Sequence, residues 1–257
     1  MPRPRRLKPL HHPYTTDPHP LVRKLESIVD LTIAERGSLH SLPLMQRAVR
    51  AGQDVVREGD RPSQAFVVLE GWIFRYKIVG DHRRQIFSFH VAGDTPDLLS
   101  IHLQTMDHSI AALTACRLGF FQHSAVRDLL ARHPRLTDVF WRDTLIDAAI
   151  FREWMVGMGR RKAPVRIAHL LCELFAKLEA IGLREGDTVP LRITQETIGD
   201  SLGLSSVHVN RAMMELRATN LFTFDGRTLT VPRWDAFAAL AEFDPEYLHL
   251  QPRARAA

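Results

Sequence analysis

Apolar residues recur at steps of three and four along several stretches of the chain, which is the spacing of one face of an α-helix. This spacing predicts helices over residues 21–36, 42–49, 124–132, 135–158, 163–181 and 234–243. The segment 157–162 contains Gly157 and Gly159 and predicts a hinge that divides the chain into two parts.

Between residues 50 and 122 the spacing changes from helical to two-fold. Short β-prone runs are separated by turn signals such as Gly59-Asp60 and Gly93-Asp94. The runs cover residues 55–57, 65–69, 73–79, 85–89, 110–114 and 117–122. Several short strands at regular spacing predict a β-sandwich or barrel.

Residues 194–220 carry the most specific pattern in the chain. Thr194 suits a helix N-cap, Gly203 suits the left-handed position after a helix, and Ser205 suits the N-cap of a second helix. Two short helices across a glycine turn describe a helix-turn-helix, whose second helix enters the major groove of DNA. Residues 221–231 follow as a β-hairpin signal, with a type I′ turn expected at Asp225-Gly226. The unit is therefore predicted to be a winged helix.

The outer face of the second helix offers groups that can read bases. It carries Val207, Asn210 and Arg211. Arg can bond bidentately to guanine, Asn to adenine, and Val can touch a thymine methyl group. The alternative is a helical hairpin with no role in nucleic-acid binding, and the wing that follows weighs against it.

Composition and charge narrow the function classes. The 257 residues are 45% hydrophobic, enough for two ordinary domains, and a net charge of +5 with a pI near 9.6 suits a polyanionic partner. No run approaches the roughly 18 apolar residues of a membrane span, and the N-terminus lacks the apolar core of a signal peptide. We therefore expect a cytoplasmic protein with no membrane partner. No nucleophile elbow, phosphate loop or metal-ligand spacing occurs, so we expect no enzyme, no cofactor and no metal site.

The first 20 residues are rich in basic side chains and proline and poor in apolar ones. The basic residues are Arg3, Arg5, Arg6 and Lys8. We expect a disordered basic tail over residues 1–20, because such a segment cannot bury enough apolar surface to become ordered. A basic arm that touches DNA phosphates is the alternative. A metal site at His11, His12 and His19 has less support, since no further ligands accompany them.

The segment ITQETIGDSLGLSSVHVNRAMMELRATNLFTFDGRTLTV resembles the DNA-binding domain of the Crp–Fnr family of bacterial transcription regulators, and REWMVGMGRRKAPVRIAHLLCEL before it resembles the same family. The order of the barrel turns is similar to that of cyclic-nucleotide-binding domains. The resemblance implies an α+β fold: an N-terminal double-stranded β-helix (jelly-roll-like) barrel, a long dimerisation helix and a C-terminal winged helix-turn-helix. The implied parts are a sensor barrel over 21–125, a dimerisation helix over 126–160 and a DNA-binding domain over 161–250.

The resemblance also assigns roles within the helix-turn-helix. A homodimer would bind a palindromic operator whose half-sites lie one helical turn, about 34 Å, apart. Base edges would be read by Ser206, Val207, Asn210 and Arg211. Phosphates would be contacted by Thr194, Gln195, Ser205 and His208. The expected partners are double-stranded DNA, a second copy of the chain and RNA polymerase.

The helix over 135–158 would form the dimer. Its residues Leu136, Val139, Asp143, Ile146 and Ile150 alternate at steps of three and four, as in a coiled coil. We therefore expect the four apolar members of this seam, Leu136, Val139, Ile146 and Ile150, at the dimer interface. The alternative is that the seam packs against the chain's own barrel.

The effector site of the family is not matched. Family members that bind cyclic AMP hold its ribose and phosphate with a Gly-Glu pair and with an Arg followed by Ser or Thr. The corresponding positions here read Asp97-Leu98 and His108-Ser109, and a neutral His is a poor replacement for a permanent bidentate cation. We expect a degenerate site, in a barrel that either takes an unknown small-molecule effector or is purely structural.

Two cysteines, Cys116 and Cys172, are too few for the four-ligand iron–sulfur cluster that some relatives use to sense oxygen. The sequence thus predicts a sequence-specific DNA-binding transcription regulator, in which the barrel acts by shifting the long helix. The alternative is a small-ligand-binding module whose winged helix mediates protein contacts.

Overall fold

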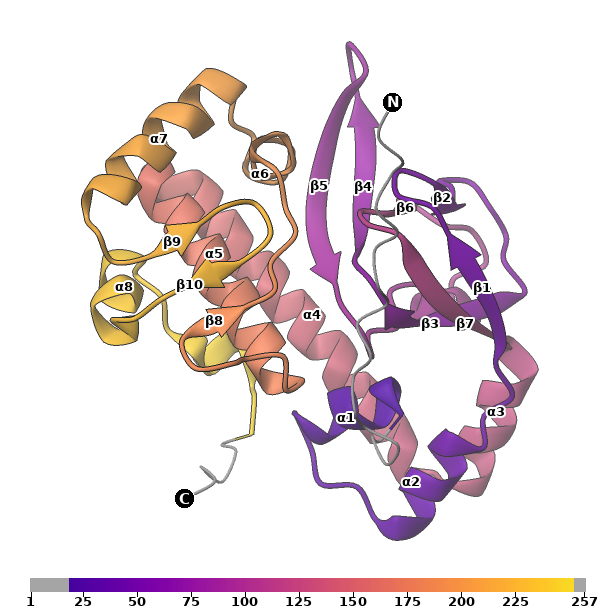
Figure 1. The fold of residues 1–257 in the computed structure, drawn as a ribbon. Helices are drawn as coiled ribbons and strands as arrows, with labels where there is room; N and C mark the ends of the chain where they lie inside the picture. Colours follow the sequence, from indigo (N-terminus) through magenta and orange to yellow (C-terminus); the bar gives the residue numbers. More distant parts are fainter. Residues whose placement is uncertain (1–18, 252–257) are drawn as a thin grey trace, which may run out of the picture.

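The computed structural model describes residues 19–251, so nearly all of the predicted tail over residues 1–20, with His11 and His12, lies outside the described residues. Figure 1 shows a β-barrel and a C-terminal domain joined by the long helix α4. None of the helices in the described part of the chain is long and apolar enough to cross a membrane.

The barrel consists of two antiparallel sheets. One has the order β1 (Met45–Val49), β7 (Cys116–Gln122), β3 (Gln64–Glu70). The other has the order β2 (Asp54–Val56), β6 (Ser109–Ala112), β4 (Ile73–Val79), β5 (Arg83–His90). Fully buried Phe66, Ile73 and Ile110 fill the space between the sheets. All six strands expected from the two-fold spacing are therefore confirmed, with their ends within two residues of the predicted ones.

Residues 42–49 form no helix, contrary to the prediction. Strand β1 pairs with β7 along its whole length, from Met45 opposite Phe120 to Val49 opposite Cys116. Four of its five residues are exposed. Backbone pairing with β7 therefore determines this element, and it overrides a weak helical pattern.

The single helix predicted over residues 21–36 is two helices, α1 (Pro20–Glu26) and α2 (Ile33–His40). The Thr32 hydroxyl accepts a hydrogen bond from the Glu35 N–H (3.3 Å), and the Glu35 carboxylate accepts one from the Thr32 N–H (2.8 Å). This capping box starts α2 afresh. The helical spacing extends across the break because Ile28 and Leu31, in the connection, are also buried.

Three further helices follow the barrel: α3 (His123–Arg132), α4 (Arg135–Arg160) and α5 (Ala163–Ala180). Gly157 and Gly159, expected in a hinge, lie inside the last turns of α4. The chain turns only at residues 161–162, because Pro164 suits the first turn of α5 but not a helix interior.

The C-terminal domain combines the helix-turn-helix with a small sheet. Helices α6 (Gln195–Leu202) and α7 (Ser206–Ala218) are followed by strands β9 (Thr223–Phe224) and β10 (Leu229–Thr230), and β10 also pairs with β8 (Thr188–Val189). The helix predicted over 234–243 ends earlier, as α8 (Trp234–Leu240), and a 3-10 turn, η2 (Pro245–Leu248), follows it.

The turn of the wing is longer than predicted. Four residues join β9 to β10, and Gly226 alone among them has a positive φ, whereas a type I′ turn requires two. The Asp225 carboxylate accepts hydrogen bonds from the N–H groups of Arg227 and Thr228, each at 2.8 Å. This side chain closes the loop in place of a tighter backbone turn.

Candidate nucleic-acid interface and effector pocket

The two helices of the helix-turn-helix begin at the expected caps. The Thr194 hydroxyl accepts a hydrogen bond from the Thr197 N–H (3.1 Å) at the start of α6. The Ser205 hydroxyl accepts one from the His208 N–H (3.3 Å) at the start of α7. Thr194, Ser205 and His208 are exposed and Gln195 is half-buried, so these groups lie at the surface around the two helix N-termini.

Two glycines set the angle between α6 and α7. Gly203 takes a φ of 63° at the end of α6, as its position in the sequence predicted. Sequence reasoning missed Gly199. A Cβ at that position would lie 2.7 Å from the carbonyl oxygen of Leu204, so only glycine lets α6 pack this closely against the turn.

Helix α7 has a buried side and an exposed side. The buried side consists of Val209, Ala212, Met213 and Leu216. All four residues predicted to read bases are exposed: Ser206, Val207, Asn210 and Arg211. Met214, which the sequence analysis did not select, is 65% exposed on the same side. The sequence could have indicated Met214, because a residue three positions after Arg211 lies on the same side of the helix.

The helix-turn-helix also contacts the barrel directly. The Arg84 guanidinium on β5 pairs with the Asp200 carboxylate on α6 at 2.6 Å, and the Gln85 amide donates to the Ser201 carbonyl (3.0 Å). In addition, Lys177 of α5 donates to the Phe89 carbonyl of β5 (2.8 Å). These contacts join segments that are about 90 to 120 residues apart, so no local pattern could have indicated them.

The predicted dimer seam of α4 faces the chain itself. Leu136, Val139, Ile146 and Ile150 are each at most 6% exposed and belong to the main hydrophobic core. The alternative weighed from the sequence, packing on the chain's own barrel and neighbouring helices, describes them better. Little surface of these four side chains is left for a second copy to contact.

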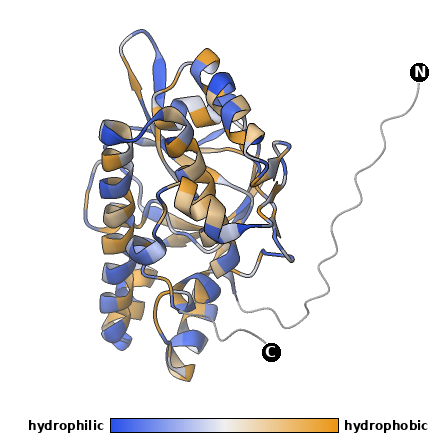
Figure 2. Cartoon of the chain, turned by 90° about the vertical axis from the view of Figure 1, so that its left-hand side faces the viewer, coloured by the Kyte–Doolittle hydropathy of each residue, from blue (hydrophilic) through white to orange (hydrophobic). Residues whose placement is uncertain are grey.

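A different side of α4 is apolar and exposed. Trp141 is 64% exposed, Leu145 49% and Met155 69%. Figure 2 shows hydrophobic bands between hydrophilic ones along α4, at the left of the view. Helix α4 therefore has two apolar sides, and among the described residues one is buried while the other is exposed.

In the predicted effector site, Asp97 has a structural role. Its side chain is 1% exposed, and its carboxylate accepts a hydrogen bond from the Phe66 N–H on β3 (2.9 Å). Burial raises the pKa of Asp97 to about 8. Leu98, next to it, begins a short 3-10 turn (Leu98–Ile101). The carboxyl group therefore holds the backbone of β3, and at neutral pH it is largely protonated.

His108 is likewise built into the barrel. Its Nδ1 lies 2.6 Å from the Asp107 carboxylate, and its ring packs edge-on against Phe87, which in turn contacts Phe151 of α4. Burial lowers the pKa of His108, with a further contribution from Arg75, and Asp107 only partly opposes this. The neighbouring Ser109 hydroxyl accepts from the Glu58 N–H (3.0 Å). The four residues of the degenerate site therefore present aromatic and neutral groups where a cyclic phosphate would need a cation.

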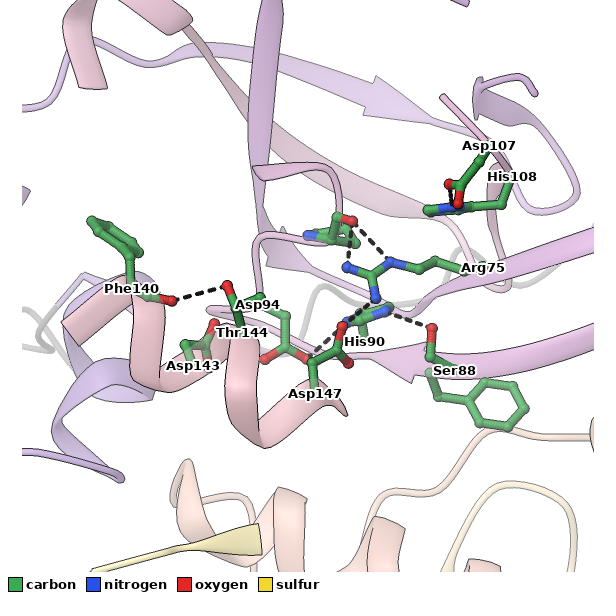
Figure 3. A network of polar contacts seen from close by, with 12 residues as sticks. Arg75, Ser88, His90, Asp94, Asp107, His108, Phe140, Asp143, Thr144 and Asp147 are labelled. Atoms are coloured by element: carbon green, nitrogen blue, oxygen red, sulfur yellow. Dashed lines mark hydrogen bonds and ion pairs between the residues drawn. The ribbon is translucent and has the colours of Figure 1, made fainter. Parts of the chain in front are cut away.

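A network of partly buried ion pairs lies beside this site, between the barrel and α4 (Figure 3). The Arg75 guanidinium pairs with Asp147 and donates to the Pro96 carbonyl (2.8 Å from Nε). The Lys24 ammonium lies 3.3 Å from both Asp94 and Asp143. Each cation is therefore matched by carboxylates of the same chain.

The network lines a cavity of about 80 Å³ that also touches Leu98. His90 lies in its wall, and burial lowers the pKa of that ring to about 4, so it is neutral at pH 7. The charged groups in the wall are three cations, Lys24, Arg75 and Lys177, and three carboxylates, Asp94, Asp143 and Asp147. The formal charges of the wall therefore balance, and each of the cations Lys24 and Arg75 is already paired with carboxylates.

The same architecture occurs in solved structures. FixK2 from Bradyrhizobium japonicum superposes with a TM-score of 0.69 at 22% identity, over 77% of this chain and 96% of that one. A c-di-GMP-responsive global regulator from Xanthomonas campestris superposes with a TM-score of 0.62 at 16% identity, over 78% and 99% of the two chains. At these identities the likeness establishes the fold.

Sequence comparison agrees with the fold. Residues 46–133 match the cyclic nucleotide-binding domain, and residues 165–240 match the Crp-like helix-turn-helix domain. The transcriptional activator FnrL of Cereibacter sphaeroides is 27% identical over 184 residues, 70% of this chain and 73% of that protein. The nitrogen fixation regulation protein FixK of Bradyrhizobium diazoefficiens is 31% identical over 168 residues, 65% and 69% of the two chains.

A β-barrel joined by a long helix to a winged helix-turn-helix defines a class of DNA-binding transcription regulators. Within that class, the chain belongs to the Crp–Fnr family. Its fold and its function as a transcription regulator are those that the sequence predicted.

The raised pKa of Asp97 predicts how the stability of the fold changes with pH. Between the ordinary value near 3.9 and the folded value of about 8, the folded chain holds a proton that the unfolded chain has released. The stability from this protonated carboxyl is complete below pH ~4 and is lost as the pH rises through ~8. Asp97→Asn keeps the acceptor for the Phe66 N–H but cannot ionise. Its stability relative to the wild type should therefore increase by on the order of 1–3 kcal/mol from pH 5 to pH 8.5, measured by urea unfolding.

Asp128→Asn, on the exposed side of α3, is the control. The prediction fails if the stability of both variants changes with pH as that of the wild type does.

The geometry of the degenerate site predicts that cyclic AMP does not bind at micromolar concentration. Asp97 is committed to the Phe66 N–H, and neutral His108 supplies no charge for the phosphate. Loss of two charge-assisted contacts, each worth roughly 1.5–3 kcal/mol, leaves an affinity of about millimolar or weaker. Isothermal titration checks this, with a cyclic-AMP-binding regulator as positive control. A micromolar dissociation constant that is accompanied by tighter operator binding would contradict the prediction.

Proposed function

We propose that the chain binds a two-fold symmetric operator as a homodimer, with α7 of each copy in the major groove. The proposal rests on the exposed side of α7. Asn210 and Arg211 are exposed there, in the second turn after the capped N-terminus of the helix. The proposed base-reading residues are Ser206, Val207, Asn210 and Arg211. The proposed phosphate contacts are Thr194, Gln195, Ser205 and His208, whose positions at helix N-termini favour anions.

The dimer in this proposal uses the exposed side of α4. Trp141, Leu145, Ala148, Arg152 and Met155 follow one another at steps of four and three, which is the repeat of a two-helix seam. Pairing with a second copy would cover Trp141, Leu145 and Met155, three of the exposed apolar side chains of α4. This seam replaces the one formed by the buried residues Leu136, Val139, Ile146 and Ile150.

Each part of the chain has its own role in this proposal. Residues 21–125 would serve as the sensor, 126–160 as the dimerisation helix and 161–250 as the DNA-binding domain. The name of the relative FnrL, a transcriptional activator protein, supports a role as an activator. RNA polymerase as a partner, a place in the cytoplasm and the lack of catalysis are further parts of the proposal.

The signal would reach α7 through α4 and β5. Arg75 and Lys24 tie the barrel to α4, and Arg84 ties β5 to α6. These pairs hold the parts together without cyclic AMP. A different small-molecule effector would have to enter the 80 Å³ cavity and exchange contacts with these charges.

Arg211→Ala should weaken specific binding by about 1–3 kcal/mol and flatten the preference at one base pair of each half-site, because a bidentate guanine contact is lost. Fluorescence anisotropy with the operator and with a random duplex measures both effects. Arg132→Ala, an exposed arginine on α3, is the control. Equal loss of affinity for both duplexes would mean that Arg211 contacts a phosphate.

Leu145→Glu should convert the dimer into monomers, because it places a carboxylate in an apolar seam at a cost of several kcal/mol if the group stays ionised. Sedimentation equilibrium measures the change. Leu103→Glu is a matched control, since Leu103 is 54% exposed and lies on the barrel. Ile146→Glu should instead destabilise the fold, because Ile146 is buried within the chain. A Leu145→Glu dimer of unchanged affinity would place the interface elsewhere.

A further inference from the structure

Two large apolar side chains are exposed on the C-terminal domain. Val207 is 66% exposed and Met214 is 65% exposed, and the other large apolar side chains among described residues 163–251 are at least partly buried. Both belong to α7. One exposed apolar side chain on a protein surface is ordinary, but two that share a helix face with Arg211 indicate a surface made for a partner.

These residues form a single stripe along the helix. Val207, Arg211 and Met214 are separated by steps of four and three residues, and an α-helix makes one turn in about 3.6 residues. The buried residues of α7 project from the opposite side, toward the domain core. The stripe is therefore the part of α7 that points most directly away from the domain, and in the proposed complex it enters deepest into the groove.

We propose that Met214 is a further specificity-determining residue, which together with Val207 contacts thymine methyl groups on either side of the base pair read by Arg211. The inference rests on the proposed binding of an operator by α7. The C5-methyl of thymine is the apolar group that base edges present in the major groove. Met is long, flexible and polarisable, so it can reach such a methyl from two turns into the helix.

The spacing of the two side chains fits stacked base pairs. Val207 and Met214 are seven residues apart, which is about 10.5 Å along the helix at about 1.5 Å per residue. Because a helix in the major groove is not parallel to the DNA axis, this distance projects onto at most about three steps of about 3.4 Å. Each half-site should therefore contain two thymines about two to three base pairs apart, on the same strand or on opposite strands, with the pair read by Arg211 between them.

The test begins with the operator itself. The full-length wild-type chain selects duplexes from a random pool, and each thymine of the selected half-site is then replaced by deoxyuridine, which removes only the methyl group. The wild type should lose about fourfold in affinity at two positions about two to three base pairs apart, the equivalent of ~0.8 kcal/mol for one methyl-sized group. Met214→Ala should lose a similar factor on the thymine operator and become insensitive to deoxyuridine at one of these positions, and Val207→Ala at the other.

Met45→Ala is the matched control, because Met45 is an exposed methionine on β1, and it should follow the wild type at every position. A Met214→Ala protein that loses affinity but keeps the wild-type sensitivity at every thymine would overturn the inference and assign Met214 to the sugar–phosphate backbone. Unchanged binding by Met214→Ala would also overturn it, because the side chain would then make no contact with the operator. Failure to select any duplex in the first step would contradict the proposed function itself, so the two failures are distinguished.

Discussion

Helix α4 is held in one register against the barrel by partly buried ion pairs. Asp147 pairs with Arg75 of β4, and Asp143 pairs with Lys24 of α1. These charged groups have lost part of their hydration, so a helix rotated or shifted by one residue would be destabilised by the loss of both pairs. Apolar packing alone would tolerate such shifts more easily, since it is not directional. The ion pairs therefore decide which side of α4 faces the barrel and which side remains exposed.

The same register extends to the DNA-binding domain. Helix α4 continues without interruption to Arg160, and α5 follows after two residues. Strand β5 provides a second connection, because Lys177 bonds to its backbone and Asp200 of α6 pairs with its Arg84. The orientation of α7 relative to the barrel thus depends on two independent routes. A change in the barrel can reach the recognition helix through either of them.

The effector site illustrates how far residue chemistry can be read from a sequence. Asp97-Leu98 in place of the family's Gly-Glu pair, and His108 in place of its Arg, indicated a weakened nucleotide site from the residue types alone. What these residues do instead depends on distant neighbours. Asp97 accepts from Phe66, 31 residues away, and His108 packs on Phe87 of β5. Their protonation states follow from burial, which only the folded chain defines.

The sequence by itself determined what depends on neighbours a few residues apart: the caps Thr194 and Ser205, the left-handed Gly203, and the six strands with two-fold spacing. Tertiary structure decided what depends on competition between distant surfaces. It placed β1 in a sheet, where strand pairing replaced a predicted helix. It also turned Leu136, Val139, Ile146 and Ile150 inward, because α4 has two apolar sides that follow the same spacing. Periodicity marks such a side as apolar, but only the barrel and its ion pairs determine which one is buried.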